Sequence, residues 1–213
     1  MSDIFREIDE ELRRDNLLKL WQRHGRYVII GAVVVLAIAG GVVAWRDHLV
    51  NERKAVSVRY FGALSLIGDK KDGDAAKLFG EIAQSGDGYA VLARFEEAGL
   101  QAESGDRAGA IAIYDAIAKS SDVDPEFRDL AVLLSVMRGL PDGDAKAAIE
   151  RLAPLTESGR PWRPTALELT AAADLKAGDK PAALAAYKQL ADDLAAPEGL
   201  RGRAAEMAAA LAP

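Results

Sequence analysis

The chain has 213 residues, of which 50% are apolar, 28% are charged and 6% are aromatic, and it contains no cysteine. This length is enough to bury a hydrophobic core, and the lack of cysteine excludes a disulfide framework, a thiolate metal site and a cysteine nucleophile. The net charge is −6, and residues 1–26 hold six acidic and six basic side chains, so the negative charge lies further along the chain. An acidic domain without a basic stripe argues against nucleic acid as a partner.

Residues 1–26 have the pattern of an amphipathic helix. Ile4, Phe5, Ile8 and Leu12 recur at helical spacing, and acidic side chains crowd the first turns, where the helix dipole favours them. With no net charge the segment is not a polybasic lipid anchor. Two interpretations remain open, docking on a partner and packing at the membrane surface.

Residues 27–45 form an apolar run whose only ionisable group is the Tyr27 phenol. As a helix this run spans about 28 Å, close to the ~30 Å hydrocarbon core of a bilayer. Tyr27 and Trp45 bracket it, as aromatic rings do at the two membrane interfaces. Core helices of soluble proteins seldom run so long without a charge, and signal peptides have shorter apolar cores. We therefore predict an uncleaved signal anchor that contacts the lipid bilayer through residues 27–45.

The flanking charges bear on the orientation of this span. Within fifteen residues the N-terminal side carries five lysines or arginines and the C-terminal side carries four. The positive-inside rule therefore favours a cytoplasmic N-terminus by a small margin.

From about residue 70 the chain repeats itself. A Gly-Asp pair followed by a helical stripe occurs at Gly105, Gly143 and Gly178, and a weaker copy fits a frame that starts at Lys70. The frames start 35, 38 and 35 residues apart, a period typical of helix-pair repeats. In each copy the glycine supplies a turn, the aspartate caps the next helix, and an alanine five positions after the glycine allows close packing.

The same pattern places the other helices and the domain boundaries. Helices are expected at 51–67, at 89–104, 126–139 and 165–177 before the Gly-Asp pairs, and at 199–211, where the last helix caps the array. The predicted fold is all-α, with one N-terminal transmembrane helix followed by an α-solenoid of helix pairs. Its predicted parts are a cytoplasmic amphipathic segment (1–26), a transmembrane helix (27–45) and a repeat domain (46–213).

The motif Gly-Asp-x-x-x-Ala-aliphatic-x-x-aromatic is similar to the turn and second helix of tetratricopeptide repeats. Together with the opening MSDIFREIDEELRRD and the single span, it resembles the YfgM-like family of ancillary subunits of the Sec translocon. The resemblance implies a single-pass protein of the bacterial inner membrane, with a cytoplasmic N-terminus and a periplasmic repeat domain. It implies protein partners, namely translocon subunits, a periplasmic chaperone and translocating chains.

The sequence lacks the common motifs for catalysis and metal binding. His24 and His48 flank the span on opposite sides, so they cannot share a metal. The sequence has no HExxH pattern, no glycine-rich phosphate loop and no Gly-x-Ser-x-Gly elbow. We therefore predict that the protein is not an enzyme and has no catalytic residue, cofactor or metal.

Four residues are candidates for partner contact. The concave face of a solenoid of helix pairs is lined mainly by the first helix of each unit, which suggests Arg94, Glu97 and Gln101, although ordinary exposed polar residues would look the same. Trp162, in a proline-bounded loop, either anchors a partner or fills the joint between helices. The predicted function is a membrane-anchored protein-interaction scaffold associated with the Sec translocon and periplasmic chaperones. The alternative is a scaffold of envelope assembly or cell division that uses the same repeats for another partner.

Overall fold

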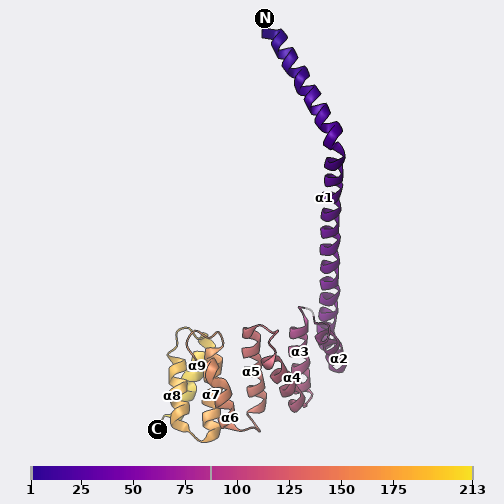
Figure 1. The fold of residues 1–213 in the computed structure, drawn as a ribbon. Coiled ribbons are helices and arrows are strands. Elements are labelled where there is room, and N and C mark those ends of the chain that lie inside the picture. The colour runs from indigo at the N-terminus through magenta and orange to yellow at the C-terminus, as the bar shows by residue number, and fades with distance from the viewer. Residues whose placement is uncertain (1, 87, 213) are drawn as a thin grey trace. The chain divides into compact units, whose positions relative to one another are not determined.

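The computed structural model describes residues 2–86 and 88–212, and its regular structure is entirely helical there. The chain divides into two units, residues 1–55 and residues 56–213. Helix α1 (Ser2–Gly68) makes up the first unit and contributes its last residues to the second (Figure 1). The predicted parts 1–26 and 46–213 also include Met1, Asp87 and Pro213, which lie outside the described residues.

The first unit contains a helical stretch that is long and apolar enough to cross a membrane. Within residues 23–68 the most apolar window of 18 residues has a mean hydropathy of 2.6, and none of the side chains that the structure describes in that window is buried. In the described part of the chain this is the one helix that meets both criteria, by length and composition.

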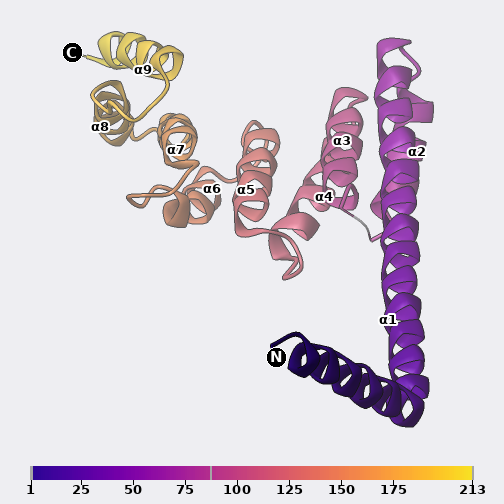
Figure 2. The same cartoon turned by 90° about the horizontal axis from the view of Figure 1, so that it is seen from above.

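The second unit is an array of helices that follow one another in chain order (Figures 1 and 2). After the end of α1 come α2 (Asp72–Ala83), α3 (Ala90–Glu103), α4 (Arg107–Lys119), α5 (Pro125–Gly139), α6 (Ala145–Leu152), α7 (Arg163–Ala177), α8 (Lys180–Ala191) and α9 (Glu198–Leu211), with a 3-10 turn, η1 (Ala153–Leu155), directly after α6. Each helix from α2 to α9 packs on the next, but α6 packs chiefly on α7 and less on α5. The predicted all-α array of helix pairs is confirmed. The ends of α3, α5, α7 and α9 lie within two residues of those expected, whereas the expected helix 51–67 is the last part of the continuous helix α1.

The hydrophobic core is divided into four clusters along the array. The clusters join α1, α2 and α3, then α3, α4 and α5, then α5, α6 and α7, and finally α7, α8 and α9. A solenoid has this arrangement because each pair of helices buries its apolar face only against its neighbours. The apolar residues five, nine and twelve positions after the glycine of each Gly-Asp pair are all buried: Ala110, Ala148, Ala183, Tyr114, Leu152, Tyr187, Ile117, Leu155 and Leu190.

The predicted aspartate caps are also present. The carboxylates accept hydrogen bonds of 2.9–3.0 Å from backbone N–H groups in the first turns of α4, α6 and α8: Asp106 from Gly109, Asp144 from Lys146 and Asp179 from Ala182. Gly178 before α8 has φ 84°, a left-handed conformation that glycine adopts at little cost. Gly143 is needed for a different reason, which is close packing: a Cβ atom there would lie only 2.8 Å from the carbonyl oxygen of Gly139. The Gly-Asp pair therefore shapes the turn and begins the following helix.

The first repeat lacks both of these residues. Lys70 occupies the glycine position with φ 59°, and Lys71 occupies the cap position of α2 without a side-chain hydrogen bond. Ala63, seven residues before Lys70, is fully buried, as are Ala98 and Ala171 at the same offset in later repeats. The end of α1 is therefore the first helix of the first repeat.

We expect that restoring the pattern in this repeat will stabilise it. Lys70→Gly relieves the left-handed conformation of a residue with a Cβ atom, and Lys71→Asp supplies the missing cap, so each should raise the free energy of unfolding by about 1 kcal/mol. Urea unfolding of the purified chain, followed by circular dichroism, measures both effects. Lys77→Gly, at an exposed position within α2, is the control and should lower stability by about 1 kcal/mol. A similar loss with Lys70→Gly would show that Lys70 is not strained.

Candidate protein-binding site

Arg94 and Glu97 lie one turn apart on α3 and line a pocket of about 350 Å³ between α2, α3 and α4. Arg94 Nη2 donates to the backbone carbonyl oxygen of Ala83, the last residue of α2, at 3.4 Å. Gln101 is not among the lining residues; its Oε1 lies beside Gly109, where a Cβ atom would come within 2.4 Å of it. Two of the three α3 candidates therefore share one pocket.

The remaining lining of this pocket is small and weakly polar. It consists of Gly80, Ala83, Gln84 and Gly86 from α2 and the turn after it, and of Ile113 and Ala116 from α4. No sequence signal marked these residues, because glycine and alanine occur throughout helical repeats. The pocket forms because such short side chains face one another across neighbouring helices.

The Glu97 carboxylate is the unusual group of the pocket. Burial raises its pKa above the usual value, and the positive charge of Arg94 offsets only part of that rise. A carboxyl group whose pKa rises on folding loses part of its hydration without gaining an equal interaction. Perturbed acids in pockets are concentrated at functional sites.

Trp162 lies in a different part of the array. Its Nε1 donates to the backbone carbonyl oxygen of Glu126 at 3.0 Å, and its half-buried ring packs on the cluster of α5, α6 and α7. The ring therefore spans the joint between two repeats and uses its N–H within the domain. The four candidate residues do not form a single site.

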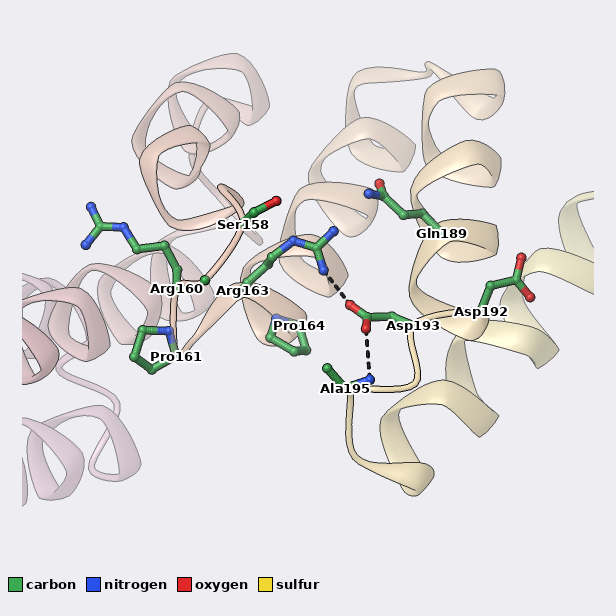
Figure 3. A pocket seen from close by; sticks show the side chains of 10 residues that line it. Ser158, Arg160, Pro161, Arg163, Pro164, Gln189, Asp192, Asp193 and Ala195 are labelled. Atoms are coloured by element: carbon green, nitrogen blue, oxygen red, sulfur yellow. Dashed lines mark hydrogen bonds and ion pairs between the residues drawn. The ribbon is translucent and has the colours of Figure 1, made fainter.

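A second, larger cleft of about 710 Å³ lies next to Trp162, between the loop before α7 and the end of α8. Figure 3 shows Arg163 and Asp193 joined by an ion pair in this cleft, with Asp193 also accepting the backbone N–H of Ala195 at 3.0 Å. The side chains of the pair are only 20% and 16% exposed, and Arg160 is paired with Asp129. The arginines of this cleft form ion pairs with aspartates, which hold the loops together. In the described part of the chain, no ion pair engages Glu97.

One cluster of polar groups has to be distinguished from a catalytic triad. Ser135 Oγ donates to Asp115 Oδ1 at 2.6 Å, and Arg151 Nη2 donates to the same oxygen at 2.6 Å. A serine nucleophile needs a free base and access to substrate, but this serine is 1% exposed and its carboxylate is already engaged. In the described part of the chain no three His, Asp or Glu side chains are grouped to hold a metal.

Comparison with known families decides what kind of array this is. The family described as Tetratricopeptide repeat-like domain matches residues 19–207. The chain belongs to this family. No curated protein matches it. Tetratricopeptide repeat-like domains are typically interaction modules without catalytic activity, and the concave surface created by their stacked repeats binds other proteins. The chain therefore carries a protein-interaction domain of the tetratricopeptide repeat-like family.

Proposed function

We propose that the protein is a single-pass membrane protein whose tetratricopeptide repeat-like array holds other proteins close to the membrane. On this proposal the N-terminus is cytoplasmic, the array is periplasmic, and the protein acts at the Sec translocon, where it brings a chaperone to emerging chains. The observation that carries the proposal is the combination, in one chain, of an exposed apolar helix and an interaction domain.

The side chains of residues 27–45 support membrane insertion. Nine large aliphatic side chains of this stretch are 49–70% exposed: Ile29, Ile30, Val33, Val34, Val35, Leu36, Ile38, Val42 and Val43. Soluble proteins rarely expose continuous apolar surfaces of this size, because hydration of apolar surface is unfavourable. Lipid tails would remove this surface from water.

A single labelling experiment tests the topology. Because the chain has no cysteine, Ser121→Cys introduces one thiol at an exposed position between α4 and α5. A membrane-impermeant maleimide is applied to spheroplasts before and after lysis. Labelling before lysis is the expected result. Labelling only after lysis would place the array in the cytoplasm and contradict the translocon proposal.

Crosslinking in intact cells then tests the partners. Recovery of translocon subunits and a periplasmic chaperone with the full chain is the expected result. Recovery of envelope-assembly or division proteins in their place would favour the alternative scaffold, which uses the same repeats.

A further inference from the structure

The two charged side chains of the α2–α4 pocket differ in what they bind. The Arg94 guanidinium reaches the end of α2, where unpaired carbonyl groups carry partial negative charge. In the described part of the chain no hydrogen bond and no ion pair reaches the Glu97 carboxylate. Glu97 is therefore the group in this pocket that remains available to a ligand.

The surroundings of Glu97 are open enough to admit a side chain from outside. A Cβ atom at Gly80 would lie 3.5 Å from Glu97 Oε1, so the glycine leaves space directly beside the carboxylate. Ala83, Ala116 and Ile113 supply short or aliphatic walls. The volume of about 350 Å³ is at the lower end of the range for ligand pockets, which suits one inserted side chain.

The chemistry of the pocket matches a basic side chain. Lysine and arginine have an aliphatic stem that packs on apolar walls and a cationic head that forms strong hydrogen bonds with a carboxylate. Residues 56–213 carry 25 acidic and 18 basic side chains, a net charge of −7, and an acidic surface attracts cationic partners over a distance.

We propose that this pocket holds a lysine or arginine side chain of a partner protein, whose cationic head donates hydrogen bonds to the Glu97 carboxylate. The inference rests on the proposed function, since it supposes that the array binds proteins. It adds the chemistry of the partner and the residue that recognises it.

If Glu97 serves binding and not the fold, removing its charge should not lower the Tm. Because folding raises the pKa of Glu97, its ionised form destabilises the fold above the pKa of the unfolded chain. Glu97→Gln removes the charge and keeps the shape, so the Tm at pH 7 should stay the same or rise. Glu103→Gln, an exposed position on the same helix, should leave the Tm unchanged. A clear fall in Tm for Glu97→Gln alone would show that the carboxylate is structural and would overturn the proposal.

Carbodiimide coupling tests the contact itself, because it joins a carboxylate to an amine without a spacer. The probe is the capped peptide acetyl-Gly-Ser-Ala-Ala-Lys-Ala-Ala-Ser-Gly-amide, added to the full chain in detergent, and the products are located by mass spectrometry. We expect about tenfold more product at Glu97 than at the more exposed Glu103, the ratio that one charge-assisted hydrogen bond supplies. Ala116→Leu, which fills the pocket and keeps the carboxylate, should abolish the excess, and an arginine version of the peptide should compete. Coupling that merely follows exposure, with Glu103 ahead of Glu97, would overturn the proposal.

Two results separate this inference from the proposed function. If cellular partners copurify equally with the Glu97→Gln variant and with the unaltered chain, the scaffold stands and the pocket proposal is overturned. If the unaltered chain recovers no partner, the proposed function fails whatever the coupling shows. Loss of the partners with both Glu97→Gln and Ala116→Leu would support the scaffold function and the pocket proposal together.

Discussion

Tyr60→Ala is expected to lower the free energy of unfolding of the repeat domain by about 3–5 kcal/mol. Tyr60 is 8% exposed, and its ring centroid lies 5.4 Å from that of Phe79 and 5.1 Å from that of Tyr89. Its hydroxyl donates to Glu96 Oε1 at 3.2 Å. Burial and the neighbouring Glu96 charge raise the pKa of Tyr60 to about 12. Alanine would leave a cavity where α1, α2 and α3 meet.

The neighbouring residue supplies a matched control. Phe61 is also aromatic and lies on the same helix, but it is 60% exposed. Phe61→Ala should change the free energy of unfolding by less than about 0.5 kcal/mol. Urea unfolding measures both variants, and hydrogen exchange of the α2 amides locates the loss, since solenoids unfold repeat by repeat. Equal losses in the two variants would show that the end of α1 is not packed as described.

The second large effect is expected from Asp115→Asn, which weakens the contact between α4, α5 and α6. One oxygen of Asp115 accepts hydrogen bonds from the buried Ser135 and from Arg151. Asparagine loses the charge-assisted part of this network, so we expect a loss of about 1–2 kcal/mol at pH 7. The expected loss is limited because the Arg151 side chain is 40% exposed and solvent screens the pair. Asp142→Asn, which breaks the exposed pair with Arg107, should cost less than about 1 kcal/mol.

The effect of Asp115 should depend on pH in a defined direction. Burial alone would raise the pKa of Asp115, but the hydrogen bonds from Ser135 and Arg151 and the charge of Arg151 outweigh it and lower the pKa below its usual value. A carboxylate with a lowered pKa stabilises the fold above its unfolded value, and this contribution is lost as the pH falls through its folded value. Urea unfolding at about pH 7 and about pH 3 should therefore show the gap between the unaltered chain and Asp115→Asn narrowing in acid. A gap that widened would contradict this sign.

The sequence predicts those parts of the fold that depend on local patterns. The Gly-Asp pairs, the buried alanine five residues later and the apolar positions after it recur with one period, and each is set by residues in a single turn or helix. The first repeat matches the pattern less well because Lys70 and Lys71 replace its glycine and aspartate. The buried Ala63 shows that the end of α1 completes this repeat.

The contacts between repeats could not be predicted individually. Trp162 bonds to Glu126 and Arg203 to Glu168, 36 and 35 residues away, so these partners lie one repeat apart. The period predicts that separation, but not which polar pairs are close enough to bond. The Glu97 pocket shows the same limit. The position of Glu97 on its helix makes it a candidate, whereas the other walls of the pocket come from α2, the turn after it and α4.

If residues 27–45 span a membrane, as proposed, the end of α1 limits where the array could be cut from its anchor. Proteolytic cleavage between Trp45 and Val56 would free a fragment that keeps Tyr60 and its cluster. Cleavage after Gly68 would remove the first helix of the first repeat and expose Phe79, which is fully buried in the intact chain. A fragment that begins within residues 46–55 would therefore keep the whole second unit, and a fragment for crystallisation should begin there as well.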